Sequence, residues 1–160
     1  MESTFPVWPY YEKRQINSAL EVLRSGKVNY WTGNKCKAFE NEFAKYVGTK
    51  YSIAVANGSL ALSLAYLACG IGKGDEVITT PRSFVATASS ISLLQATPVF
   101  AEVDIDSGNI TAESIEKVIT KKTKAIVVVH MAGWPACMVE IKSLAKKYGI
   151  YLIEDCAQAH

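Results

Sequence analysis

The chain has 160 residues, 49% of them apolar and 20% charged, which is enough for one ordinary domain with a sizeable core. This composition excludes a disordered tail and a small protein held together by disulfides. Seventeen Lys and Arg against fifteen Asp and Glu give a net charge of +2, without the clustered basic excess that marks a nucleic-acid or membrane-surface binder. We therefore expect the partner to be a small molecule or a second copy of the chain.

Two helices are predicted before about residue 50, so residues 1–50 are expected to form an N-terminal helical segment with a loop. Their apolar residues recur at helical spacing, with Ile16, Leu20 and Leu23 in the first helix and Cys36, Phe39, Phe43 and Val47 in the second. Gly26 and Gly48 are placed to end them. The loop between the helices, residues 27–33, is rich in aromatic and hydrogen-bonding side chains.

From residue 51 the sequence alternates between short β-branched runs and helical patterns, which is typical of βαβ units. Strands are predicted at about 51–56, 76–80, 97–101, 124–130 and 150–154, and helices at 59–69, 84–94, 111–119 and 138–148. Residues 125–129 are apolar on both faces, as expected where helices cover both sides of a parallel sheet. The predicted fold class is α/β, with a doubly wound, mainly parallel sheet over residues 51–160.

The most apolar stretch, residues 60–72, is too short to cross a bilayer. Four scattered cysteines at positions 36, 69, 137 and 156 lack CxxC spacing, so neither a zinc site nor a disulfide framework is indicated. We expect buried free thiols, no metal and a cytoplasmic location. The sequence stops at His160, just beyond a predicted apolar strand whose edge native sheets normally cover, so we expect the N-terminal part of a longer protein.

Ligands of open parallel sheets bind at the carboxyl ends of the strands. After the first predicted strand, Asn57-Gly58-Ser59-Leu60 combines a turn glycine with a hydroxyl residue at a helix start, which suits a phosphate. Taken alone, this motif is more often an ordinary N-cap. It lacks GxGxxG. The glycines of residues 70–74 follow a predicted helix and precede a strand, the reverse of the dinucleotide context, and they do not match the P-loop pattern either.

Two further strand ends carry candidates. Phe84 follows the second strand, where its ring could stack on a planar ligand, although a phenylalanine there is more often part of the core. Asp155 follows the fifth strand, where a carboxylate must face solvent or a cation; the preceding Glu154 is expected to point the other way, toward a surface base. Phosphate site, ring and carboxylate together describe pyridoxal 5'-phosphate (PLP), whose pyridine nitrogen stays protonated beside a carboxylate.

Several motifs also occur in the order typical of one family. They include Trp31-Thr32-Gly33, Asn57-Gly58-Ser59-Leu60-Ala61-Leu62, Gly72-Lys73-Gly74-Asp75-Glu76, Phe84-Val85-Ala86-Thr87-Ala88 and Glu154-Asp155-Cys156-Ala157-Gln158-Ala159-His160. On these motifs the chain, from about Val7 to its last residue, closely resembles the DegT/DnrJ/StrS sugar aminotransferases, which are PLP-dependent enzymes of fold type I.

The resemblance implies a site, a reaction and an assembly. It assigns the cofactor to Gly58, Ser59 and the Leu60 amide at the phosphate, Phe84 stacked on the pyridine, Asp155 at its nitrogen and Gln158 at its phenolic oxygen. Family members move an amino group from glutamate to a keto carbon of a nucleotide-linked deoxysugar, often for lipopolysaccharide or other surface polysaccharides, and are typically homodimers. The family fold also sets the first strand apart from the other four, which predicts poor stability for this piece alone.

The departures from the family pattern leave alternatives open. The Schiff-base lysine of the family matches no lysine here, and Lys124, at the start of its predicted strand, is at the wrong end of the sheet. We expect the lysine downstream of His160, so residues 1–160 alone should be inactive. A minor branch of the family has histidine there and dehydrates sugars. Another fold type I enzyme, a non-catalytic binding or regulatory relative and a purely structural βαβ domain are further alternatives. Cys137 stands where the family suggests Asp, which predicts the loss of a helix N-cap.

Weaker candidates remain. His130 ends an apolar strand and is interpreted as structural rather than catalytic, because no carboxylate partner is identifiable nearby in the sequence. Tyr30, Trp31 and Thr32 could contact a sugar nucleotide or the neighbouring subunit, or pack locally. Arg82 could bind a phosphate or a carboxylate, although a solvated turn arginine is commoner.

Overall fold

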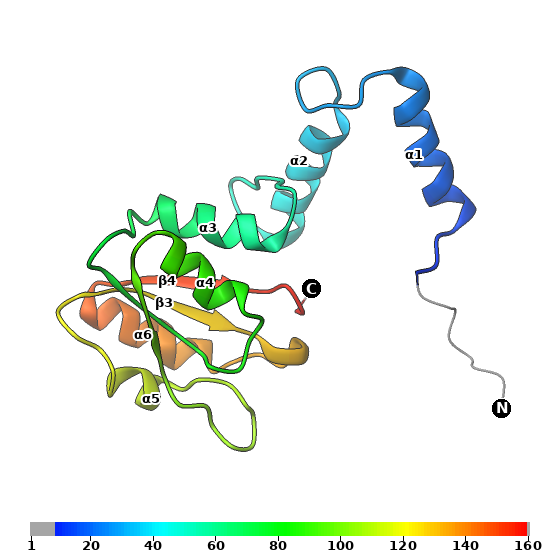
Figure 1. Ribbon diagram of the computed structural model, residues 1–160. Coiled ribbons are helices and arrows are strands. Elements are labelled where there is room, and N and C mark those ends of the chain that lie inside the picture. The colour runs from blue at the N-terminus through cyan, green and yellow to red at the C-terminus, as the bar shows by residue number, and fades with distance from the viewer. Residues whose placement is uncertain (1–8, 160) are drawn as a thin grey trace, which may run out of the picture. The chain divides into compact units, whose positions relative to one another are not determined.

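The computed structural model describes residues 9–159 and divides into two compact units, one ending at Ala54 and the other beginning at Val55 (Figure 1). The sequence-based boundary lay between residues 50 and 51. Val7, where the resemblance begins, and His160, which closes its last motif, lie outside the described residues.

The first unit contains the two expected helices, α1 (Lys13–Ser25) and α2 (Lys35–Val47). Both end where a glycine adopts a left-handed backbone, with φ 67° at Gly26 and 75° at Gly48, as the sequence predicted. On α2 the rings of Phe39 and Phe43 stack with centroids 5.6 Å apart. The large apolar side chains Ile16, Leu20 and Leu23 of α1 are exposed, and none of the residues of this helix is buried.

Residues 51–56 are not a strand, so this prediction is wrong. A strand needs a neighbour for its backbone hydrogen bonds, and here the backbone bonds to side chains instead. The N–H of Ala54 donates to Oε1 of Glu40 at 2.9 Å, and the carbonyl of Tyr51 accepts from the Thr49 hydroxyl at 3.0 Å. The composition of residues 51–56 favours a strand, but no partner strand pairs with this segment among the described residues.

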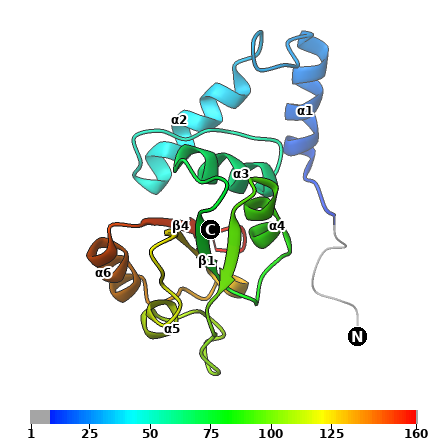
Figure 2. The ribbon, with the colours of Figure 1, turned by 60° about the vertical axis from the view of Figure 1, so that its left-hand side comes forward.

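The second unit is built on a four-stranded, all-parallel sheet in the order β2-β1-β3-β4. The strands are β1 (Glu76–Thr79), β2 (Thr97–Phe100), β3 (Thr123–Val129) and β4 (Tyr151–Asp155). Helices α3 (Gly58–Ala68) and α4 (Ala86–Leu93) cover one face. Helices α5 (Ala112–Glu116) and α6 (Met138–Tyr148) cover the other, as both views show (Figures 1 and 2). The predicted α/β class is confirmed.

Each face of the sheet has its own core, because successive side chains of a strand point to opposite faces. Val77 and Val127 pack under α3 and α4 with the buried Tyr66. Ile78 and Ile126 pack on the other side, against residues of α5 and α6. This alternation is the physical basis of the apolar runs in the sequence, and it fixes which side chains reach each face at the ends of the strands.

The helix boundaries follow local signals. Thr111 caps α5, its Oγ1 accepting from the Ser114 N–H at 3.1 Å, but the helix stops at Glu116 instead of the predicted 119. Gly149 ends α6 with φ 67°. At its start Cys137 makes no capping hydrogen bond, which confirms the predicted loss of an N-cap.

The four cysteines are free, but the prediction that all are buried is wrong, because Cys36 and Cys137 are exposed. Among the described residues no helix is long and apolar enough to span a membrane.

Candidate functional site

A cavity of about 180 Å³ lies where the start of α3, the loop before α4 and the end of β4 converge. It is lined by Gly58, Ser59, Leu62, Phe84, Ala86, Thr87, Asp155 and Ala157. A second hollow of about 450 Å³ shares Gly58, Leu62, Asp155 and Ala157 with it. The structure therefore brings four of the six predicted cofactor residues together around one cavity at the carboxyl end of the sheet.

The start of α3 leaves hydrogen-bond donors free at this cavity. Asn57 is an N-cap, as the simpler interpretation of the motif proposed, and its Oδ1 accepts from the Leu60 N–H at 3.0 Å. The N–H groups of Gly58 and Ser59 and the Ser59 hydroxyl have no hydrogen-bond partner within residues 9–159. An N-cap and an anion site coexist here, since a helix start has four N–H groups and this cap uses one of them.

Phe84 lies in the loop before α4, and 73% of it is exposed. The interpretation of Phe84 as a core residue is therefore wrong. Because Phe84 lines the cavity while remaining largely uncovered by protein, its ring is accessible to a planar ligand.

The Asp155 carboxylate is half-buried and accepts two hydrogen bonds from the protein. Its Oδ1 accepts from the Ala157 N–H at 3.2 Å, and its Oδ2 accepts from the Thr87 hydroxyl at 3.4 Å. No Lys, Arg or His of the described chain forms an ion pair with it. A partly desolvated carboxylate without a cation gains from a positively charged ligand group placed against it.

Thr87 and its neighbours were not singled out by the sequence. The Thr87 side chain is 2% exposed and its Oγ1 lies 2.8 Å from the Ser83 hydroxyl oxygen. The hydroxyl of Tyr66, buried on α3, donates to the Thr87 carbonyl at 3.0 Å. Burial raises the pKa of Tyr66, and the Asp155 charge raises it further. The available signal was the i, i+4 spacing of Ser83 and Thr87 at a strand end.

Two predicted cofactor contacts are placed differently. Gln158 does not line the cavity; its Oε1 accepts from the Ala132 N–H at 2.7 Å, holding a residue with a left-handed backbone (φ 53°). Leu60 is half exposed on α3, and its amide is already bonded to Asn57.

Residues 30–32 belong to the first unit and bond locally. The Tyr30 hydroxyl donates to Glu40 Oε2 at 3.1 Å, and Asn29 Oδ1 accepts from the N–H groups of Trp31 and Thr32 at 3.0 Å each. The Glu40 hydrogen bond raises the pKa of Tyr30. Trp31 is 87% exposed, so its indole surface is accessible within this unit.

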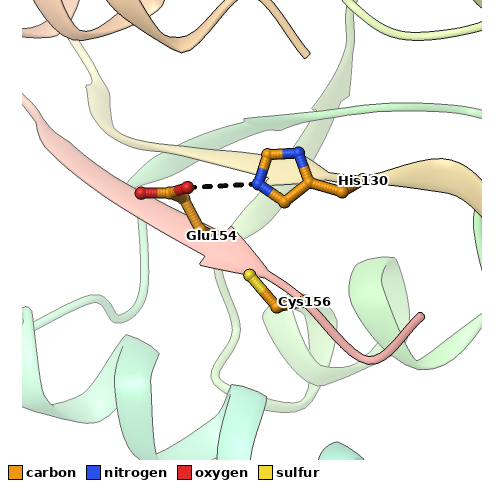
Figure 3. A group of neighbouring side chains, drawn as sticks. All are labelled: His130, Glu154 and Cys156. Atoms are coloured by element: carbon orange, nitrogen blue, oxygen red, sulfur yellow. Dashed lines mark hydrogen bonds and ion pairs between the residues drawn. The ribbon is translucent and has the colours of Figure 1, made fainter. Parts of the chain in front are cut away.

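His130, Glu154 and Cys156 place an imidazole nitrogen, a carboxylate oxygen and a sulfur within 4.8 Å of one another (Figure 3). The hydrogen bonds of His130 argue against a metal. Its Nδ1 accepts from the Ala136 N–H at 3.2 Å, so the proton is on Nε2, which donates to Glu154 at 3.1 Å. A metal-bound imidazole instead donates from its second nitrogen. The structural interpretation of His130 is supported, and the carboxylate partner missed in the sequence is Glu154.

The remaining candidates lie apart from the cavity. Arg82 is exposed, as the commoner interpretation proposed. Lys124 lies near the start of β3, at the opposite end of the sheet from Asp155, where its Nζ donates to the Gly70 carbonyl at 2.7 Å. It is on the wrong side for a covalent bond to a ligand in the cavity.

Residues 9–160 match the model of the DegT/DnrJ/EryC1/StrS aminotransferase family. The chain belongs to this family. A curated relative is the dTDP-3-amino-3,6-dideoxy-alpha-D-galactopyranose transaminase of Aneurinibacillus thermoaerophilus. It is 45% identical over 161 residues, which cover 95% of this chain and 44% of the relative.

Two solved structures illustrate the likeness of the fold. The aminotransferase from Psychrobacter cryohalolentis is 54% identical with a TM-score of 0.95, covering 98% of this chain and 40% of its own. NtdA from Bacillus subtilis, with its cofactor PMP bound, is 33% identical with a TM-score of 0.85, covering 90% of this chain and 33% of its own. The chain thus spans less than half the length of each of these three relatives.

The cavity of this family member fits a flat, phosphorylated, cationic ring. The same space is lined by N–H donors at a helix start that have no hydrogen-bond partner within residues 9–159, by an exposed phenylalanine, and by a carboxylate that has no cationic partner in the same range. These three features match the phosphate, the ring face and the protonated nitrogen of a pyridine cofactor in turn.

Proposed function

We propose that this chain forms the cofactor-binding part of a PLP-dependent aminotransferase, an enzyme that moves an amino group from glutamate to a keto nucleotide-sugar. The observation that carries the proposal is the single cavity around Gly58, Ser59, Phe84 and Asp155. The transaminase and aminotransferase relatives, 45% and 54% identical, support the reaction class. PMP, the amino form of PLP, is bound in a relative that is 33% identical, which supports the cofactor.

Each wall of the cavity would hold a different part of the cofactor. The N–H groups of Gly58 and Ser59 and the Ser59 hydroxyl would bind the phosphate at the positive end of the α3 dipole. Phe84 would stack on the ring, and Asp155 would accept a hydrogen bond from the ring nitrogen and keep it protonated. When bound, PLP supplies the electron sink that amino transfer requires.

Two contacts implied by the resemblance require local change. The Leu60 amide would have to leave Asn57 before it could bind a phosphate. Gln158 would have to release the Ala132 N–H before it could bond the phenolic oxygen. We therefore assign the phosphate to Gly58 and Ser59 first and keep Leu60 and Gln158 as secondary contacts.

Amino transfer also needs a lysine that binds the cofactor covalently and moves a proton. We propose that this lysine follows His160 in the full-length protein and that residues 1–160 alone are inactive. Histidine at that position would instead favour a sugar dehydratase, so identifying this one residue separates the two reactions.

The assembly and setting belong to the same proposal. The full-length protein would be a cytoplasmic homodimer acting in deoxysugar, lipopolysaccharide or other surface-polysaccharide biosynthesis, and Tyr30, Trp31 and Thr32 would contact the nucleotide-sugar or the neighbouring subunit. The free cysteines fit a reducing compartment. The accessible Trp31 indole fits a stacking role.

The test is cofactor binding and turnover by the full-length protein. PLP should produce a visible absorption band that borohydride reduces to a stable adduct, and glutamate with a keto nucleotide-sugar should give an amino sugar. Absence of both the band and the adduct would favour a non-catalytic relative. A band with dehydration but no amino transfer would favour the dehydratase.

A further inference from the structure

The hydroxyl of Thr87 is a buried polar group that points at the carboxylate of the cavity. Thr87 is 2% exposed, and its Oγ1 lies 3.4 Å from Asp155 Oδ2 and 2.8 Å from Ser83 Oγ. A threonine in a helix often bonds instead to the carbonyl four residues earlier. Thr87 bonds outward to β4, 68 residues away in the sequence.

The direction of these bonds follows from the protons available. An ionised carboxylate only accepts, so the single hydroxyl proton of Thr87 goes to Asp155. Ser83 must then donate to Thr87 Oγ1, since the two hydroxyls share one contact. The result is a chain of donors that runs from Ser83 through Thr87 to Asp155 and stabilises the charged carboxylate.

Thr87 is itself fixed from the other side. The Tyr66 hydroxyl, on a fully buried residue of α3, donates to its carbonyl at 3.0 Å. Together with the Ala157 N–H, which bonds Asp155 Oδ1 at 3.2 Å, these contacts hold the carboxylate from two elements. Each carboxylate oxygen still has a lone pair for a ligand.

We propose that Thr87 is a positioning residue, which orients the Asp155 carboxylate toward the ring nitrogen of the cofactor. This inference rests on the proposed PLP site. Thr87 is not proposed to react; it acts through Asp155.

The test uses the full-length protein and PLP. Thr87→Val keeps the shape of the side chain and removes the hydroxyl, Thr87→Ser keeps the hydroxyl, and Ser92→Ala on the exposed side of α4 is the matched control. Thr87→Val should weaken PLP binding by about fivefold, the value of one hydrogen bond. The ¹⁵N chemical shift of ring-labelled PLP should move toward the unprotonated nitrogen, a change that loosened packing alone does not produce.

Each possible result supports or overturns the role of Thr87. Wild-type affinity and ¹⁵N shift in Thr87→Val would overturn the inference while leaving the PLP site intact, whereas a wild-type protein that binds no PLP would overturn both. If Thr87→Val does not fold, Ser83→Ala replaces it, because it removes the donor to Thr87 from a less buried position. A ring nitrogen less protonated than in the control then supports the proposal, and an unchanged one contradicts it.

Discussion

Glu154 and Asp155 are adjacent on β4 yet bond on opposite faces of the sheet. Glu154 accepts from His130 at 3.1 Å on the face covered by α5 and α6, and Asp155 accepts from Thr87 on the face covered by α3 and α4. Strand alternation therefore gives two neighbouring carboxylates different environments. Glu154 pairs with His130 at the end of β3, whereas Asp155 lines the cavity.

Replacing Asp155 should affect cofactor binding most strongly. Asp155→Asn removes the negative charge opposite the ring nitrogen, and losing a hydrogen bond to a charged group should weaken PLP binding by about 10- to 100-fold. Fluorescence titration of the full-length protein measures this. Asp106→Asn, at an exposed turn, is the control; equal affinities in the two variants would rule out the assigned role of Asp155.

Phe84 should matter for binding and little for stability, because 73% of it is exposed. Phe84→Ala should weaken PLP binding by about fivefold, the value of an aromatic contact, while the melting temperature stays close to that of the wild type. Val85→Ala, at a neighbour that is 69% exposed, controls for changes in the loop. A large fall in melting temperature with unchanged PLP affinity would instead place Phe84 in a core.

His130 should stabilise the fold. His130→Ala leaves the buried Ala136 N–H without its acceptor, which should lower the free energy of unfolding by about 1–3 kcal/mol in urea titrations. Glu154→Gln retains an acceptor for Nε2 and should cost less. Zinc should not raise the melting temperature, since His130 Nε2 carries the proton; zinc stabilisation abolished by His130→Ala would show that the cluster binds metal.

The Cys156 thiol should react slowly with alkylating reagents. Burial raises its pKa, and the charges of Glu154 and Asp155 raise it further. A raised pKa means less thiolate at a given pH, so iodoacetamide should label Cys156 slowly at neutral pH and faster as the pH rises. Mass spectrometry of the cofactor-free protein compares it with the exposed Cys36 and Cys137. Glu154→Gln should accelerate the labelling of Cys156, because it removes one of the two negative charges. Equal labelling rates at all three cysteines would contradict a raised pKa of Cys156.

The fold from residue 55 onward was largely predictable because its signals are local. Apolar runs such as residues 125–129 become buried strands when helices cover both faces. Gly149 ends α6 because it adopts the left-handed backbone that follows a helix. The strand expected at 51–56 failed because a strand also requires a neighbour. The composition of a segment indicates its tendency to form a strand, but it does not show whether a neighbouring strand is present to pair with it.

The sequence predicted the site residues that lie at the ends of strands, but not the contacts between side chains of different helices and strands. Phe84 and Asp155 follow or end strands that the structure contains, so parallel topology brings them to one edge. Residues 57–59 reach the same edge as the start of α3, although the strand expected before them is absent. The Thr87 contact and the His130–Glu154 pair depend on which side chains meet across helices and strands 68 and 24 residues apart. Sequence spacing carries no record of such distances, whereas strand alternation would have placed Glu154 on the face of His130.

The most direct test of the central claim is a crystal structure of the full-length protein grown with PLP. We expect the phosphate against Gly58 and Ser59, the ring over Phe84 and the ring nitrogen within hydrogen-bonding distance of Asp155. A cofactor bound elsewhere, or one whose ring nitrogen does not contact Asp155, would contradict it.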